Sequence, residues 1–229
     1  NRRHNSDGSY GVDLNRNYSY KWSLAGVSGS GVPSDDTYYG TAPFSEPETN
    51  DVRNFMLGLT NLKAFFSYHS YGEWHMKPWS HTFSNAPGYE TLHSIALRDI
   101  SRIAAVHGVT YKEIFNLYNS SGDATDYWWN ERRIAALTTE VRPVYTGSLA
   151  GFSPPASEII PSCEENYVAA LAIIHDAAQP RVWIKDNTGD TGVEPSTGYP
   201  WESPDIWTVP AVLNQNSTVD LHIRIRNST

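Results

Sequence analysis

Two apolar stretches of the sequence each end in a residue that can do chemistry. His69 follows the apolar run 62–68, and open α/β sheets place their ligand-binding residues at such strand ends. Glu140 lies near the end of the apolar run 135–141. A carboxyl group there is costly to bury unless it is paired or transfers protons. Alone, each residue is more often structural than catalytic.

Two further segments carry polar groups suited to a ligand. Asn15 and Arg16 supply hydrogen-bond donors, and a planar guanidinium binds a carboxylate through two parallel contacts. Tyr118 stands in the polar, glycine-bearing loop 116–122, where its phenol could cover a bound ligand. Short polar segments of this kind are also common in ordinary surface turns.

The order of these segments resembles the zinc carboxypeptidase family, in its carboxypeptidase A/B branch. The resemblance covers about 1–180, and the Gly-Asp-x-Thr-Asp pattern at 122–126 is most similar to the bacterial carboxypeptidase T group. The matching segments are GVDLNRNY at 11–18, YHSY at 68–71, PW at 78–79, Tyr118 with GDATDY at 122–127, TTE at 138–140 and FSPPASEIIP at 152–161.

The resemblance implies an α/β fold, namely the C-terminal part of a mixed-sheet zinc carboxypeptidase with helices on both faces. It also implies an exopeptidase that removes C-terminal residues from peptides with one catalytic zinc ion. The resemblance implies that His69 is a zinc ligand, that Asp13 orients a histidine ligand, and that Glu140 is the general base acting on the zinc-bound water. It implies that Tyr118 is a mobile cover over the substrate. Binding of the substrate and its carboxylate is implied for Asn15, Arg16 and Tyr71.

Substrate selection is expected to depend on Thr125 and Asp123. In the family an apolar residue at the position of Thr125 favours apolar C-terminal side chains, and an acid favours basic ones. Thr125 is neither, while Asp123 supplies a negative charge nearby. We therefore expect a broad pocket that accepts both apolar and Lys or Arg termini. The resemblance also implies cis peptide bonds at Arg142-Pro143 and Ser70-Tyr71, and proline lowers the cost of the first.

The family's first zinc motif, H-x-x-E, is not found in this sequence, because none of its eight histidines is followed by Glu at i+3. An open catalytic zinc site takes three protein ligands, and His69 is one. We expect the other ligands and the arginine that polarises the scissile carbonyl to lie upstream. We also expect this polypeptide to be inactive on its own.

Helix signals lie between the apolar runs. Capping-box pairs predict helix starts at Ser45 with Glu48 and at Ser162 with Glu165, followed by apolar stripes. The stripes contain Val52, Phe55, Met56 and Leu59 in the first helix and Tyr167, Leu171, Ile174 and Ala178 in the second. A third helix is predicted over 89–106, and strands over 62–68, 110–114 and 135–141. Strands interleaved with helices predict an α/β architecture.

The composition changes after Pro180, and residues 219–225 alternate apolar and polar side chains as a half-buried strand does. We expect a partial metallocarboxypeptidase catalytic domain over 1–180 and a truncated β-rich accessory domain over 181–229. The net charge of −8 argues against nucleic acid as a partner, and no apolar run is long enough for a membrane span. We expect a monomer secreted by a bacterium, acting on peptide or protein C-termini.

Two other functions remain open. One is a pseudoenzyme or a non-catalytic module that binds peptide C-termini or glycans, with eight tryptophans and fourteen tyrosines as stacking surface. The other is a glycosidase with Glu73 and Glu140 as its paired carboxylates. The glycosidase explains neither His69 nor Arg16, and it ranks last.

Overall fold

The computed structural model describes residues 1, 3–178, 181–183, 206–209, 220–223 and 226–228. The chain divides into two compact units, Asn1–Ala177 and Ala178–Thr229. The assignment of one unit as catalytic and the other as accessory stays a prediction. In the described part of the chain no helix is both long enough and apolar enough to cross a membrane.

A four-stranded mixed sheet forms the centre of the first unit, with the strand order β1-β4-β2-β3. The strand β1 (Ala64–Ser70) pairs in parallel with β4 (Ala135–Val141). On its other edge β4 pairs antiparallel with β2 (Trp74–Met76), which in turn runs parallel to β3 (Lys112–Ile114). Because β1 and β4 run parallel, their C-terminal ends, which carry His69 and Glu140, lie side by side in the sheet.

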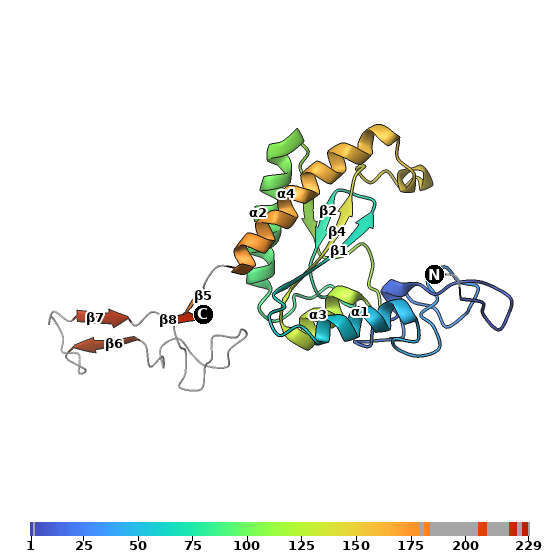
Figure 1. Ribbon diagram of the computed structural model, residues 1–229, viewed down its shortest axis with the longest axis horizontal. Coiled ribbons are helices and arrows are strands. Elements are labelled where there is room, and N and C mark those ends of the chain that lie inside the picture. Colours follow the sequence, from blue (N-terminus) through green and yellow to red (C-terminus); the bar gives the residue numbers. More distant parts are fainter. Residues whose placement is uncertain (2, 179–180, 184–205, 210–219, 224–225, 229) are drawn as a thin grey trace. The chain divides into compact units, whose positions relative to one another are not determined.

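Helices lie on both faces of this sheet (Figure 1). On one side are α2 (Tyr89–His107) and α4 (Ile159–Ala178), and on the other are α1 (Pro47–Leu57) and α3 (Ala124–Arg132). These positions confirm the predicted α/β fold with a mixed sheet covered by helices. Short 3-10 helices complete the unit: η1 (Leu14–Arg16), η2 (Leu149–Phe152) and η3 (Ala156–Glu158).

The hydrophobic core fills the space between the sheet and its helices. Trp128 of α3, Leu92 of α2 and Leu137 of β4 are completely buried within it. Burial of each such side chain contributes about 1.5–3 kcal/mol relative to exposure. This core holds the strand ends that carry His69 and Glu140 on a rigid base.

The longest regular signals in the sequence predict their elements well. The helix predicted over 89–106 is α2; Leu92, Ala96 and Ile103 are buried, and Gly108 ends it in the left-handed conformation. The strand predicted over 135–141 is β4. The strand predicted over 62–68 begins and ends two residues later, because pairing with β4 continues to Ser70. The strand predicted over 110–114 is shortened to Lys112–Ile114.

Both predicted capping boxes are wrong. The N-cap of α1 is Glu46, and the Ser45 hydroxyl donates to the Glu46 carboxylate. In α4 the helix begins at Ile159, so Ser162 lies inside it. Glu165 accepts two hydrogen bonds from Arg142, which follows β4. In both cases a contact with a neighbouring side chain replaces the local cap.

The predicted apolar stripes are also only partly correct. In α4 the side chains of Tyr167, Leu171 and Ile174 are exposed, while Ala169 and Ile173 are buried. In α1 Met56 is buried, but Val52 and Phe55 are exposed. Apolar residues occupy more than one face of these helices, and the packing of the helix on the sheet decides which face is covered.

The helix α3, the strand β2 and the three short 3-10 helices of the first unit were not predicted. The sequence of α3 is polar on average; Asp123 caps it, accepting from the backbone amides of Thr125 and Asp126 at 2.8 and 3.1 Å, and residues 124–129 are buried. Arg142-Pro143 and Ser70-Tyr71 are cis, as predicted, and Pro78-Trp79 is cis as well.

The described strands of the second unit form two antiparallel pairs. One joins β5 (Arg181–Trp183) to β8 (Arg226–Ser228), and the other joins β6 (Ile206–Val209) to β7 (Asp220–Ile223). The predicted strand 219–225 thus contains β7, while positions 219, 224 and 225 lie outside the described residues.

Candidate active site

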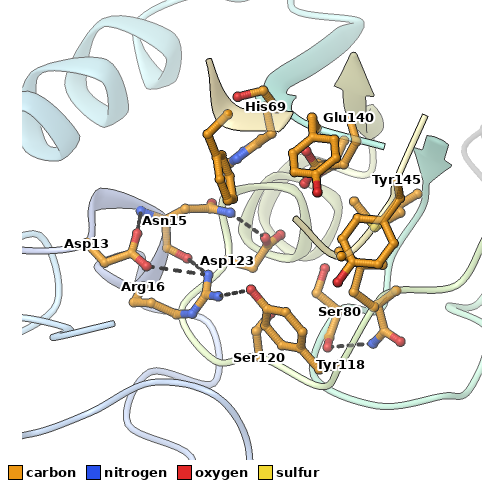
Figure 2. Close-up of a pocket in the computed structure, with 18 of the residues that line it drawn as sticks. Asp13, Asn15, Arg16, His69, Ser80, Tyr118, Ser120, Asp123, Glu140 and Tyr145 are labelled. Carbon is orange, nitrogen blue, oxygen red and sulfur yellow. Dashed lines mark hydrogen bonds and ion pairs between the residues drawn. The ribbon is translucent and has the colours of Figure 1, made fainter. Parts of the chain in front are cut away.

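His69 and Glu140 lie next to each other on the parallel strands β1 and β4, where they are direct partners in the register. Residues opposite each other in neighbouring strands point to the same face of the sheet. Both line a cavity of about 390 Å³ (Figure 2). Of the sequence-predicted site residues, the cavity is lined by Asp13, Asn15, Arg16, His69, Tyr71, Tyr118, Asp123 and Glu140.

Thr125 does not line this cavity. It is 1% exposed, and its hydroxyl donates to the Asp123 carboxylate and lies 3.3 Å from the Thr138 hydroxyl. The residue expected to select substrates therefore lies beneath the cavity, behind Asp123. Glu73 is also not among the lining residues, so this cavity does not join it to Glu140 as a glycosidase would require.

Arg16 projects into the cavity from the short helix η1. The helix is capped by Asp13, whose carboxylate accepts from the Asn15 amide at 2.9 Å. The Arg16 guanidinium is 6% exposed and donates to the Asn15 carbonyl at 2.9 Å and to the Tyr118 hydroxyl at 3.3 Å. The second Asp13 oxygen lies 4.0 Å from it. The expected contact of Asp13 with a histidine ligand stays a prediction, because the contacts described for its side chain are with η1.

Asn15 connects the same turn to helix α3. Its side-chain nitrogen donates to Asp123 at 2.9 Å, and its side-chain oxygen accepts from the Ala124 amide at 3.0 Å (Figure 2). Asp123, which is 4% exposed, therefore holds the Asn15 side chain and caps α3 at once. These contacts leave one N–H of the Asn15 amide available to a ligand.

Glu140 is the most perturbed acid of the cavity. Burial raises its pKa from 4.5 to about 7, and one carboxylate oxygen is buried without a partner in the described part of the chain. A carboxyl group with a pKa near 7 can accept and return a proton at neutral pH. The side chain is therefore suited to acid–base catalysis rather than to a structural ion pair.

His69 is held in the neutral form. Burial lowers the pKa of its imidazole, and the Nε2 atom lies 2.9 Å from the Ser67 hydroxyl. That contact leaves Nδ1 as the nitrogen for a ligand. Across the residues that the structure describes, no three His, Cys, Asp or Glu side chains meet as a metal site requires. The side chains present in this part of the chain do not by themselves fit a zinc ion.

Several lining residues were not singled out from the sequence. Ser80, Asn116, Tyr145 and Leu149 also line the cavity. The polar loop 116–122 was a signal for Asn116, but Tyr145 and Leu149 lie in a segment with no chemical pattern. Their approach to Tyr71 depends on tertiary packing, since Tyr145 and Tyr71 have ring centroids 5.5 Å apart.

Comparisons with known proteins agree with this arrangement. A family profile described as zinc carboxypeptidase matches residues 1–169. Carboxypeptidase A1 of Mus musculus is 35% identical over 184 residues, which are 78% of this chain and 43% of that protein. Carboxypeptidase B of Astacus astacus is 34% identical over 165 residues, or 70% of this chain and 53% of that protein.

Solved structures show the same similarity. The crystal structure of thrombin activatable fibrinolysis inhibitor matches with a TM-score of 0.70 and 29% identity, over 77% of this chain and 45% of that one. The chain thus spans about half the length of the relatives it matches.

Proposed function

This chain belongs to the zinc carboxypeptidase family, and from that membership we propose that it forms part of a metallocarboxypeptidase, which hydrolyses the C-terminal peptide bond of peptides. Family membership implies zinc as the cofactor. One observation carries the proposal. The same cavity contains an arginine that can bind a carboxylate and an acid whose pKa is near 7. Arg16 supplies the first group and Glu140 the second.

Arg16 binds the C-terminal carboxylate of the substrate. Its guanidinium is nearly buried, so a carboxylate placed against it forms charge-assisted hydrogen bonds that water screens only weakly. Its Nε is buried without a partner in the described part of the chain. Asn15 adds a neutral donor beside it, and the Tyr118 hydroxyl lies within reach of the same carboxylate. An enzyme that recognises a free carboxylate in this way acts only at chain ends.

Glu140 moves the proton in the hydrolysis. It takes a proton from the attacking water and delivers it to the nitrogen of the departing residue, which leaves as a free amine. The pKa raised by burial makes both transfers favourable near neutral pH. We assign His69 as the ligand that this part of the chain supplies to the zinc of the whole protein, because its imidazole is neutral and Nδ1 is open.

Asp123 gives the pocket its selectivity. It lines the same cavity as Tyr118, and its negatively charged carboxylate accepts a hydrogen bond from the Thr125 hydroxyl. A basic C-terminal side chain gains from this charge, and an apolar one fills the cavity without needing it. We propose a broad preference that covers Lys or Arg and apolar C-terminal residues.

The test uses the whole protein from which this chain comes and a set of matched peptides. The peptides end in Leu, Phe, Lys or Arg, and released amino acids are quantified. Each peptide has a control with an amidated C-terminus, which offers Arg16 no carboxylate. We expect release from the free peptides and none from the amidated ones. Binding without release would instead indicate a non-catalytic module, and release of one residue class alone would overturn the broad preference.

A further inference from the structure

The loop that carries Tyr118 is anchored to the cavity wall through one side chain. The Asn116 side-chain nitrogen donates to the Ser80 carbonyl at 2.9 Å and to the Asn119 side-chain oxygen at 3.1 Å. The backbone amide of Ser120 donates to the same Ser80 carbonyl, also at 2.9 Å. One acceptor therefore holds the loop on both sides of Tyr118 (Figure 2).

Ser80 is a rigid point of attachment. Its backbone amide donates to Asp126 of α3 at 2.7 Å, and the following residue, His81, places its Nδ1 atom 2.7 Å from the same carboxylate. Asp126 is almost completely buried. Because Asp126 belongs to a core helix, the Ser80 carbonyl cannot follow a movement of the loop.

The other side of the loop is held by the chain near Ser28. The Ser28 amide donates to the Asn119 carbonyl at 2.7 Å, and the Ser121 amide donates to the Ser28 carbonyl at 3.0 Å. By contrast, no backbone hydrogen bond joins Leu117 or Tyr118 to the described part of the chain. Tyr118 is 51% exposed, and its hydroxyl is held by a single contact with Arg16.

We propose that Asn116 is a positioning residue for Tyr118. Ser120, Ser121 and Asn119 are fixed through backbone groups, which side-chain substitution does not remove. On the N-terminal side of Tyr118, the side-chain amide of Asn116 makes the contacts that fix the loop. It sets where the phenol lies relative to Arg16, and so how the two share the substrate carboxylate. This inference rests on the proposed carboxypeptidase function.

The hydrogen-bonding groups of the Asn116 side chain are not all satisfied. Its side-chain oxygen is buried without a partner in the described residues, and leaving a buried polar group without a hydrogen bond is unfavourable. Replacement by leucine, which has a similar shape, removes that oxygen along with the two donor contacts. The effects on stability should therefore largely cancel, and the effect on Tyr118 should remain.

The experiment compares Asn116→Leu and Asn116→Ala with the unchanged whole protein. We expect KM to rise about fivefold for all the peptides, whichever C-terminal residue they carry, with little change in kcat. The reason is that about one hydrogen bond to the substrate carboxylate is lost. In a Tyr118→Phe background the same substitutions should change KM less than twofold, because the hydroxyl they position is gone. Additive effects in the two backgrounds would overturn the proposal.

Hydrogen exchange of the Ser120 and Ser121 amides, which are hydrogen-bonded to the Ser80 and Ser28 carbonyls, gives a readout that does not depend on activity. We expect faster exchange in both Asn116 variants, with the Asn119→Ala variant close to the unchanged protein because the Ser80 contact remains. Unchanged exchange would overturn the anchoring role of Asn116. If the unchanged whole protein released no C-terminal residue, the proposed function would fail, while the exchange measurement would still test the anchor.

Discussion

At the scale of single residues, Glu140 shows how the fold changes the chemistry of a side chain. Its carboxyl group ends a buried strand, and burial alone raises its pKa to about 7. The same burial lowers the pKa of His69 on the neighbouring strand. Burial disfavours the charged form of each group, so the acid holds its proton more tightly and the imidazole releases it more easily. These shifts suit the pair to the proton transfer proposed for Glu140 and the metal binding proposed for His69.

The raised pKa of Glu140 predicts a dependence of stability on pH. The folded-state pKa of about 7 lies above the ordinary value of 4.5, so the proton is bound more tightly in the folded protein. The resulting stabilisation is complete below pH 4.5 and is lost as pH rises through 7. The Glu140→Gln variant has no ionisable group at this position, so it does not lose stability in this way as the pH rises. We expect its free energy of unfolding to exceed that of the unchanged protein by about 2 kcal/mol at pH 8, reduced by partial exposure.

Urea unfolding at pH 4 and at pH 8 checks this prediction. At pH 4 the carboxyl group is protonated in the folded state and largely so in the unfolded state, so the variant and the unchanged protein should differ little. An equal difference at both pH values would show that ionisation of Glu140 does not account for the effect.

Asp123 makes a second prediction at this scale. Asp123→Asn keeps an oxygen that can cap α3 but removes the charge from the cavity. We expect kcat/KM for peptides ending in Lys or Arg to fall at least tenfold relative to peptides ending in Leu, because an ion pair in a partly buried site is lost. Asp13→Asn serves as the control, since it removes a charge from another part of the same cavity. An equal change of the ratio in both variants would contradict the role of Asp123.

At the scale of elements, the link between β4 and α4 depends on one arginine. Arg142 follows β4 and donates to both oxygens of Glu165, at 2.9 and 2.6 Å, and to Glu158 at 2.7 Å. Glu165 is 0% exposed and lies inside α4. The helix is therefore fixed against the strand end that carries Glu140 by a buried ion pair rather than by a capping box.

Removal of one partner of this pair should be strongly destabilising. Arg142→Met leaves the Glu165 carboxylate buried without its cation, and we expect the free energy of unfolding to fall by about 3–5 kcal/mol. In the double variant Arg142→Met with Glu165→Met no charge is left unpaired, and most of the loss should be recovered. Urea unfolding of the three proteins provides the comparison. A double variant as unstable as the single one would argue that the pair acts through shape and not through charge.

At the scale of the whole molecule, the proposed zinc site needs ligands that the described residues do not supply. The relatives that match are about twice as long as the matched part of this chain. A catalytic zinc takes three protein ligands, and among the described residues no group of three His, Cys, Asp or Glu side chains that includes His69 could hold the ion. Secretion, a bacterial source and the monomeric state stay predictions.

We expect residues 1–229 alone to release no C-terminal amino acid and to bind zinc weakly. The measurements are a peptide-release assay with added zinc and equilibrium dialysis of zinc against the same polypeptide. The whole protein serves as the positive control in both. Clear peptide release by residues 1–229 would show that this polypeptide completes a catalytic site with residues that the sequence did not reveal.

The sequence by itself determined the family, the α/β class and eight of the residues that line the cavity. This was possible because the proposed site residues are carried by short segments, such as 11–18 and 138–140, whose order in the sequence resembles that of the family. The helix over 89–106 and the strand over 135–141 were also predictable, since their apolar patterns are long and regular.

Only the tertiary structure decided how these residues meet. The register between β1 and β4 places His69 beside Glu140, and contacts across more than 100 positions of sequence bring Asn15 to Asp123. Tertiary packing also buries Thr125, and the contact of Glu165 with Arg142, 23 positions away, takes the place of the capping box predicted there. Local sequence specifies spacing along one element, whereas burial, and with it each pKa and each exposed face, depends on what the rest of the fold packs against it.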